Sequence, residues 1–135
     1  MNKILLIVTG SIAASRCKEI INLLHNKEIE ISCILTKEAK KYVKISEVKK
    51  LLKNKIFIDE DEKKNKMLHI NLSRDNDIIV VCPATANSIA KFANGYGDNL
   101  ASNTLLASNK NILFVPAMNS FMWHNKINQK NVRLL

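Results

Sequence analysis

The sequence predicts an α/β fold in which a doubly wound parallel sheet lies between two layers of helices. Short runs of branched apolar residues recur along the 135 residues, as expected of strands that are buried on both faces. Between these runs lie segments with apolar residues at helical spacing, and right-handed crossovers join such strands into one parallel sheet. A chain of this length buries about two-thirds of its surface, so we expect one domain over residues 1–135.

The predicted elements begin with a strand at residues 4–8, where Ile, Leu and Val form a continuous run. A helix is predicted over residues 12–24 because its apolar residues share one face, and Ser11 can cap its start. The second strand is predicted at residues 29–35, and a lysine-rich helix is predicted from Lys37. This order is that of a βαβ unit.

The middle of the chain is more polar. A helix is predicted from Ser46, because the segment SEVKKLLK places its apolar residues on one face, and a short third strand is predicted at residues 56–58. The next segment, DEDEKKNK at residues 59–66, is almost entirely charged. We expect it to be a solvent-exposed loop that adds nothing to the core.

Two further strands are predicted in the second half of the chain. Residues 78–82 form a buried strand, which is followed by a helix over residues 84–93 that stops at an Asn-Gly pair. Another helix is predicted over residues 100–107, and the fifth strand at residues 112–115. A proline follows each of these two strands and, lacking an N–H for the ladder, should direct the chain out of the sheet.

Small, hydroxyl or amide residues follow four of the predicted strands, at positions 9–11, 36, 83–87 and 116–119. In doubly wound sheets, ligands bind beyond the carboxyl ends of the strands, so these residues are candidates for a binding site. Gly10 and Ser11 at a helix start, with Thr36 nearby, fit a phosphate cradle made of backbone N–H groups and the helix dipole. The same residues also fit a plain turn and helix cap. Neither a dinucleotide nor a nucleoside triphosphate motif occurs, so a mononucleotide-sized cofactor fits better.

The formal net charge of +9 raises the question of nucleic-acid binding. The lysines are scattered, however, and aromatic residues do not alternate with basic ones as in a stacking platform. Apolar runs also stay below the roughly 20 residues of a membrane span. We therefore expect neither a nucleic-acid nor a membrane partner. Cys17, Cys33 and Cys82 are widely spaced and form no C-x-x-C pair, which favours reduced thiols in a cytoplasmic protein without a structural metal site.

Four motifs stand out in the chain: GSIAA at residues 10–14, HI-x-L at 69–72, the segment beginning PATAN at 83–102, and PAMNSFMW at 116–123. In this order and spacing they resemble the flavoprotein family of cysteine decarboxylases, and the resemblance runs from Lys3 to the last residue. It implies a flavodoxin-like or Rossmann-like three-layer flavoprotein, with residues 1–135 forming an FMN-binding domain. The pairing of PATAN with PAMN favours the coenzyme A branch of the family.

The resemblance implies a role for each strand-end segment. His69 would be the active-site base, and Asn119 would bind the substrate carboxylate. Ala117 and Met118 would face the isoalloxazine ring of FMN. The remaining FMN contacts would come from Gly10, Ser11, Ile12, Thr36, Ala84, Thr85, Ala86, Asn87 and the region from Ser102 to Thr104.

The chemistry of the family explains these residue types. Direct loss of CO2 from a cysteine carboxylate would leave an unstabilised carbanion. The resemblance implies that FMN first oxidises the thiol-bearing carbon to a thioaldehyde, which accepts the electrons of the broken bond. The resulting enethiolate then takes back a hydride and a proton. In the coenzyme A branch, these reaction steps convert 4'-phosphopantothenoylcysteine into 4'-phosphopantetheine.

The sequence differs from the family pattern in two places. Ser15 and Arg16 replace an aromatic residue that commonly follows GSIAA. Family members also continue beyond Leu135 with a last strand and a substrate clamp, which carries the cysteine that protonates the enethiol. We therefore expect a domain that is C-terminally truncated relative to the family and that performs at most the oxidative half-reaction.

Three other functions stay open. One is a peptidyl-cysteine decarboxylase on the same scaffold. Another is a flavin prenyltransferase, which shares the fold but lacks the pairing of His69 with Asn119. The third is a regulatory protein that binds flavin without releasing CO2. The resemblance also implies a homotrimer or an assembly of trimers, with flavin sites at subunit contacts where His69 can serve a neighbouring subunit.

Overall fold

The structure, a computed structural model, describes residues 2–135 and contains one five-stranded parallel sheet. The strands are β1 (Lys3–Val8), β2 (Glu30–Leu35), β3 (Ile56–Phe57), β4 (Ile78–Ala84) and β5 (Ile112–Pro116). Their order in the sheet is β3-β2-β1-β4-β5, so the chain extends the sheet on one side of β1 and then on the other. The predicted doubly wound α/β fold is confirmed.

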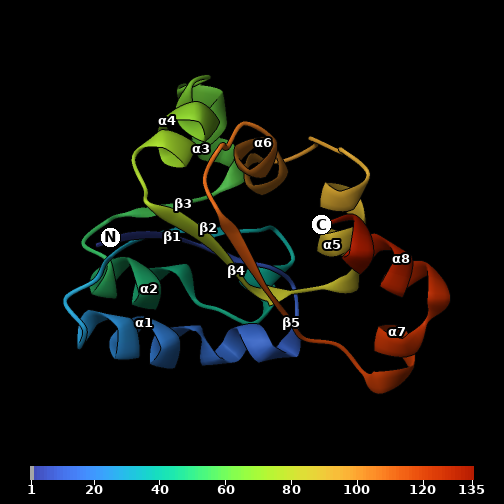
Figure 1. Cartoon of the computed structure of the whole chain (residues 1–135). Coiled ribbons are helices and arrows are strands. Elements are labelled where there is room, and N and C mark those ends of the chain that lie inside the picture. The colour runs from blue at the N-terminus through green and yellow to red at the C-terminus, as the bar shows by residue number, and fades with distance from the viewer. Residues whose placement is uncertain (1) are drawn as a thin grey trace.

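Helices cover both faces of the sheet. They are, in chain order, the 3-10 helix η1 (Ile12–Arg16), α1 (Cys17–His25), the 3-10 turn η2 (Ala39–Lys41), α2 (Ile45–Leu51), α3 (Asp59–Lys64), α4 (Leu68–Arg74), α5 (Ala86–Ala93), α6 (Leu100–Leu106), α7 (Ser120–His124) and α8 (Lys126–Leu134). Helices α1 and α2 lie on one face, whereas α3, α4 and α6 lie on the other (Figure 1). Helices α5, α7 and α8 gather near the carboxyl ends of β4 and β5 (Figure 1).

Strand β1 explains the continuous apolar run at the start of the sequence. Its side chains alternate between the two faces, and each face has its own apolar core. Leu5 and Ile7 belong to the core beneath α4, α5 and α6, whereas Leu6 and Val8 belong to the core beneath α1 and α2. All four side chains are fully buried, and burial of each contributes about 1.5–3 kcal/mol to folding.

Most predicted boundaries agree with the structure to within two residues. The predicted helix from Ile12 begins as η1 before it becomes α1, and Ser11 Oγ accepts a hydrogen bond from Ala13 N at 3.2 Å, as expected of a cap. The lysine-rich helix predicted from Lys37 is wrong beyond the single turn η2. Ala39 supplies the buried side chain of that turn, and so small an apolar surface does not sustain a longer helix.

The prediction of a loop at residues 59–66 is also wrong, because α3 forms there. The order of the charges accounts for the helix. Four acidic residues occupy its first turn and two lysines its last, which suits the helix dipole, and Asp61 Oδ2 accepts a hydrogen bond from Ile58 N at 2.8 Å. The segment also has tertiary contacts, since Asp59 Oδ1 accepts a hydrogen bond from Leu100 N at 3.0 Å.

Helices α4, α7 and α8 have no counterpart among the predicted elements. Helix α8 shows why periodicity can fail, because its buried residues are Asn128 and Asn131. Asn94, the C-cap of α5, donates from Nδ2 to Asn131 Oδ1 at 3.2 Å. Val132 is the side chain of α8 that packs against the apolar core, and one such residue gives a sequence pattern little to detect.

The two prolines behave differently. Pro116 is the last residue of β5, as predicted. Pro83 lies within β4, which continues to Ala84, so the predicted strand end at Cys82 is wrong. The pairing of β4 with β5 shifts register between Val81 and Ala84, because Pro83 has no N–H to donate to the ladder.

Within residues 2–135, the helices are too short and too polar for any of them to cross a bilayer.

Asp77 fastens the start of β1 to the start of β4. Its Oδ2 accepts hydrogen bonds from the backbone N–H groups of Asn2 and Lys3, both at 2.9 Å. These two bonds hold the pKa of the Asp77 carboxyl below its ordinary value. The carboxylate therefore stabilises the fold above the ordinary aspartate pKa of about 4, and this contribution is lost as the pH falls through the lower folded-state pKa.

We expect Asp77→Asn to lower the midpoint of urea unfolding near neutral pH, because an amide cannot form charge-assisted bonds to both N–H groups. The difference from wild type should shrink as the pH falls below about 4, because the wild-type carboxyl also loses its charge. Trp123 fluorescence can follow the unfolding, with Asp75→Asn as the matched control. A difference that stays constant across this pH range would contradict the assignment.

Candidate functional site

Thr9 joins the carboxyl ends of β1 and β4, where the order of the sheet reverses. Its Oγ1 donates to Pro83 O at 2.6 Å and accepts from Thr85 N at 3.1 Å. Thr9 is buried; its bond to Pro83 O is buried as well, and its bond from Thr85 N is part-buried. The sequence places Thr9 at a strand end but does not reveal that its hydroxyl links the two halves of the sheet. This is the point at which doubly wound folds bind ligands.

The PATAN and PAMN motifs lie side by side. Ala117 N donates a hydrogen bond to Ala84 O at 3.1 Å, and Ala84 pairs with Pro116 in the sheet. The segments that follow β4 and β5 therefore leave the sheet together. Two motifs that are more than thirty residues apart in the sequence contribute to one edge of the molecule.

The hydroxyl groups predicted to contact FMN are engaged with the protein backbone. Thr36 Oγ1 accepts from Ala39 N at 3.3 Å, and Thr85 Oγ1 accepts from Ser88 N at 3.1 Å. Ser102 Oγ accepts from Asp98 N at 3.0 Å and from the neighbouring Asn99 N at 3.1 Å. Together with the Ser11 cap, these bonds fix the loops at the strand ends. These hydroxyl groups therefore hold the backbone at the edge of the sheet in place. A ligand can reach the backbone and the exposed side chains of the same segments.

An ion pair closes the loop between α5 and α6. Lys91 Nζ lies 2.9 Å from Asp98 Oδ2, and this hydrogen bond holds the pKa of the Asp98 carboxyl below its ordinary value. An open groove of about 630 Å³ beside this pair is lined by Asn87, Lys91, Asn94, Tyr96 and Asp98. Asn87, a predicted FMN contact, is exposed there, so its amide is free to meet a ligand.

A smaller cavity lies between the ends of β1, β2 and β4. It measures about 30 Å³, and its walls include Thr9, Thr36, Ser88, Asn99 and Ser102. This space is too small for a flavin, which would instead lie across the outer edge of these loops. A groove of about 510 Å³ runs along β3 and α2, but that groove lies at the opposite side of the sheet from the PATAN and PAMN motifs.

Gly10 is the position of closest backbone approach at the end of β1. An added Cβ would lie 2.3 Å from Cβ of Glu38 and 3.1 Å from its carbonyl carbon. Glycine therefore lets the loop after β1 pack against the loop after β2. Ile12, which follows, is 78% exposed, as expected of a side chain available to a ligand or to another subunit.

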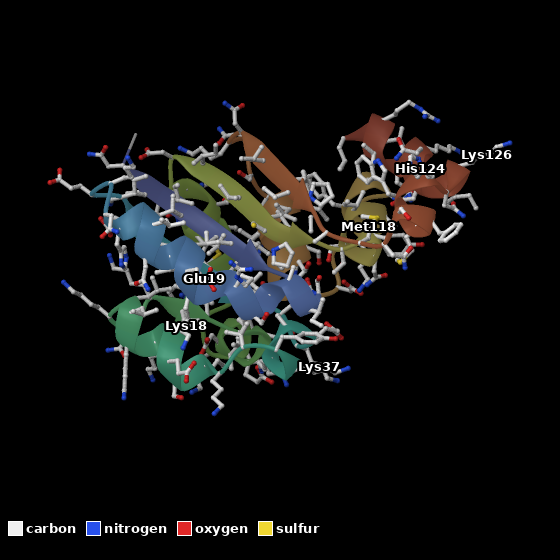
Figure 2. All side chains as sticks on the ribbon, turned by 90° about the horizontal axis from the view of Figure 1, so that it is seen from below. Lys18, Glu19, Lys37, Met118, His124 and Lys126 are labelled. Atoms are coloured by element: carbon white, nitrogen blue, oxygen red, sulfur yellow. The ribbon has the colours of Figure 1, made fainter. Side chains whose placement is uncertain are left out.

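Met118 and Asn119 follow β5, and they differ in their exposure to solvent. Met118 is half-buried against the core, and its Sδ accepts a hydrogen bond from Asn128 Nδ2 at 3.2 Å. Figure 2 shows Met118 beside the C-terminal helices, with His124 and Lys126 farther out. Asn119 is exposed and caps α7, since its Oδ1 accepts from Met122 N at 2.9 Å. This bond leaves the amide NH2 of Asn119 as the group that can donate to a carboxylate.

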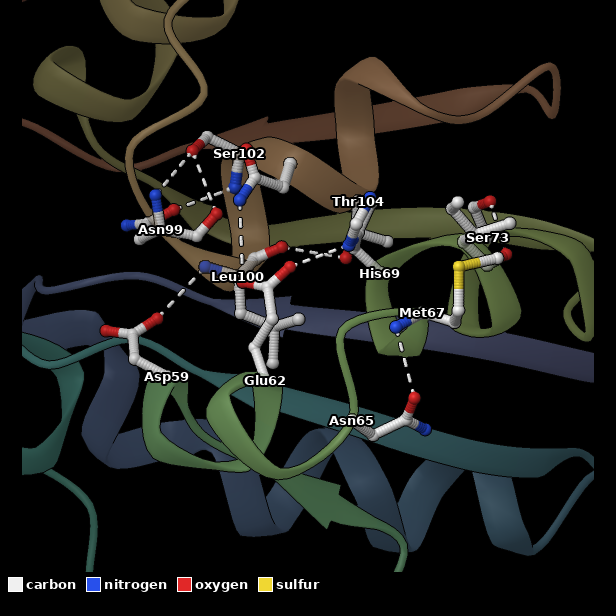
Figure 3. Close-up of polar contacts among 12 residues, drawn as sticks. Asp59, Glu62, Asn65, Met67, His69, Ser73, Asn99, Leu100, Ser102 and Thr104 are labelled. Atoms are coloured by element: carbon white, nitrogen blue, oxygen red, sulfur yellow. Dashed lines mark hydrogen bonds and ion pairs between the residues drawn. The ribbon is translucent and has the colours of Figure 1, made fainter.

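His69 lies on α4, against the helix that replaces the predicted loop. Its Nδ1 is 2.6 Å from Glu62 Oε1, and the two side chains are 25% and 21% exposed. The N–H direction is not aligned as in a hydrogen bond, but Nδ1 is shielded from solvent and Glu62 is the acid that faces it (Figure 3). Glu62 as a neighbour of His69 has no signal in the local sequence.

The structure does not bring all the predicted residues together. Helix α4, which carries His69, and α7, which begins after Asn119, lie on opposite sides of the molecule (Figure 1). The strand-end residues, by contrast, share one edge of the sheet. Within one chain, His69 is therefore apart from the strand-end edge that carries Asn119.

The residues at this edge fit a flavin mononucleotide. Gly10 leaves room for close packing of the first two loops, and Met118 offers a soft apolar surface for an aromatic ring. The amides of Asn87, in the first turn of α5, and Asn119, the N-cap of α7, are exposed. Among residues 2–135, no cluster of three or more His, Cys, Asp or Glu side chains is arranged to hold a metal ion.

Comparison with known proteins supports a flavin site. The sequence profile of the Flavoprotein family matches residues 1–135, and the chain belongs to this family. A probable phosphopantothenoylcysteine decarboxylase of Streptococcus mutans is 32% identical over 137 residues, which cover 98% of this chain and 76% of that protein. The bifunctional coenzyme A biosynthesis protein CoaBC of Haemophilus influenzae is 34% identical over 95% of this chain, which spans 32% of that protein.

Solved structures agree with these relatives. The FMN-dependent cysteine decarboxylase SpaF matches with a TM-score of 0.92 at 28% identity, covering 100% of this chain and 79% of that one. A variant PPC decarboxylase complexed with pantothenoylaminoethenethiol matches at 0.86 and 30% identity, covering 99% and 76%. A variant of EpiD complexed with the substrate peptide DSYTC matches at 0.87 and 31%, covering 99% and 76%. These similarities indicate a decarboxylase of the carboxy-lyase class.

We expect Gly10→Ala to destabilise the fold by about 1–3 kcal/mol, because the new methyl group overlaps Glu38. Urea unfolding measures the loss, and flavin fluorescence measures the weaker binding that should accompany it. The double variant Gly10→Ala/Glu38→Gly removes the Cβ that the methyl group meets, so it should recover part of the stability. Equal stability of wild type and Gly10→Ala would contradict the close approach.

Proposed function

We propose that this chain is an FMN-dependent decarboxylase that acts on 4'-phosphopantothenoylcysteine on the route to 4'-phosphopantetheine in coenzyme A biosynthesis. One observation carries the proposal: Ala117 N bonds to Ala84 O, so the exposed amide of Asn119 and the half-buried Met118 lie on the same edge as the PATAN loop. The similarity to a PPC decarboxylase and to bifunctional coenzyme A biosynthesis proteins supports this substrate.

The FMN phosphate and ribityl chain are assigned to the loops after β1 and β2. Backbone N–H groups near Gly10 and Ile12 would bind the phosphate, because Ser11 and Thr36 fix these loops through their caps. The ring would lie against Ala117 and Met118, with Ala84, Thr85, Ala86, Asn87 and Ser102 at its other side. FMN supplies a two-electron oxidation of the thiol-bearing carbon when it is bound.

Two side chains are assigned to the substrate. The NH2 group of Asn119 donates to the carboxylate, which orients the bond that breaks when CO2 leaves. His69 takes a proton from the substrate, and a general base of this kind contributes about 100- to 10,000-fold to the rate.

These assignments require more than one subunit. His69 and Asn119 lie on opposite sides of one chain, so we propose that His69 of one copy completes the site of a neighbour in a homotrimer or an assembly of trimers. Exposed apolar side chains on and after α7 are suited to such contacts, with Phe121 90% and Ile127 72% exposed.

A peptidyl-cysteine decarboxylase is the second candidate. The similarity to EpiD, which was solved with a peptide that ends in cysteine, favours it. Turnover of 4'-phosphopantothenoylcysteine against a peptide ending in cysteine separates the two substrates.

The test is anaerobic incubation of the purified protein with 4'-phosphopantothenoylcysteine, in which flavin absorbance and trapped CO2 are followed together. We expect the oxidised flavin band to bleach as CO2 is released. Faster bleaching with the cysteine peptide would move the assignment to the second candidate. Bound flavin that neither bleaches nor releases CO2 with either substrate would refute the enzyme and leave a flavin-binding protein.

Complementation tests the shared site. His69→Asn and Asn119→Ala should each lower CO2 release by about 100-fold or more, because each removes a side chain that contacts the substrate. In co-expressed mixtures of the two variants, random assortment places both intact residues in about a quarter of the sites, so activity should recover to about that level. A mixture as inactive as its components would contradict a site made from two copies.

A further inference from the structure

Glu62 is the acidic residue that faces the buried Nδ1 atom of His69. Nδ1 of His69 is shielded from solvent and lies 2.6 Å from Glu62 Oε1. An ionised carboxylate can only accept hydrogen bonds, whereas a neutral imidazole carries its hydrogen on either nitrogen. Because Glu62 Oε1 can only accept at this short distance, the carboxylate favours the tautomer with hydrogen on Nδ1.

The carboxylate is itself held from the opposite side. Asn103 on α6 donates from Nδ2 to Glu62 Oε2 at 3.4 Å. Helix α3 is tied to α6 a second time, because Asp59 Oδ1 accepts from Leu100 N (Figure 3). Glu62 therefore has one oxygen directed at α6 and the other at His69, and it cannot turn freely.

We propose that Glu62 is a positioning residue that fixes the tautomer and orientation of His69, with the hydrogen on Nδ1 and the lone pair on Nε2. The proposal rests on the proposed function for its catalytic consequence, since only then is Nε2 the atom that takes the substrate proton. After that transfer both nitrogens carry hydrogen, and the positive ring lies beside the Glu62 carboxylate. In other enzymes, a carboxylate that accepts a hydrogen bond from Nδ1–H fixes the histidine tautomer in this way.

Glu62→Gln is an informative variant because it keeps the size of the side chain. Asn103 Nδ2 donates to the outer position, which selects the oxygen of the new amide. The NH2 group then faces His69 and can only donate, so Nδ1 must become an acceptor and the hydrogen moves to Nε2. The Nε2 lone pair is lost, and kcat should fall by about 10- to 100-fold, less than in a fully buried triad because the pair is part-exposed.

The matched control lies on the same helix. Glu60 is exposed, and its carboxylate lies 3.5 Å from Lys40 Nζ. It therefore pairs with a lysine and not with the imidazole of His69. Glu60→Gln removes the same charge from α3 and should leave both the tautomer and kcat unchanged.

The test reads the tautomer directly from 15N chemical shifts of the histidine rings in the protein without substrate, with His69→Asn identifying the signal. We expect the Nδ1–H tautomer in wild type and in Glu60→Gln, and the Nε2–H tautomer in Glu62→Gln. An Nε2–H tautomer in wild type would overturn the proposal without any need for a variant. So would a Glu62→Gln spectrum that matches wild type.

Turnover separates this proposal from the proposed function. A tautomer change together with a fall in kcat at constant KM supports both. A tautomer change with unaltered CO2 release means that Glu62 positions His69 but His69 is not the base, which refutes the catalytic role alone. A fall in kcat without a tautomer change overturns the positioning role of Glu62.

Discussion

The hydroxyl of Thr9 is the contact on which the arrangement of the strand ends depends. The buried hydroxyl donates to Pro83 O and accepts from Thr85 N at the same time. Pro83 O also accepts from Thr9 N at 3.4 Å, so without the hydroxyl Thr85 N is the group that would lose its partner, at a cost of about 1–3 kcal/mol. The hydroxyl therefore adds to the backbone contact between the ends of β1 and β4, and it sets where α5 begins relative to β1.

The polar and apolar side chains at this edge of the sheet have different roles. Hydroxyls cap the helices and turns, with Ser11, Thr36, Thr85 and Ser102 all bonded to backbone N–H groups. Amides and apolar groups stay available to a ligand, and Asn119 does both because its oxygen caps α7 while its NH2 group is free to donate. Rigid loops of this kind hold a cofactor without rearrangement, which lowers the entropic cost of binding.

The sequence predicts the sheet well because the strands bury both faces, and such runs as residues 4–8 are recognisable without tertiary information. It also predicts which strand ends meet, since parallel strands share one carboxyl edge. It fails where long-range polar contacts decide the structure. Residues 59–66 look solvated, yet Asp59 binds a backbone group 41 positions away, and the buried residues of α8 are asparagines. The partner of His69 is of this kind, because its identity depends on how α3 meets α4.

We propose that a flavin binds across the carboxyl edge of β1, β2, β4 and β5. Amide hydrogen exchange of the protein with and without added FMN, read by mass spectrometry, tests it most directly. With FMN bound, we expect slower exchange at the ends of these four strands, in residues 9–14, 36–39, 84–89 and 117–123, and no change along α2 and β3. Protection confined to the groove beside α2 and β3, or no protection at the four strand ends, would contradict it.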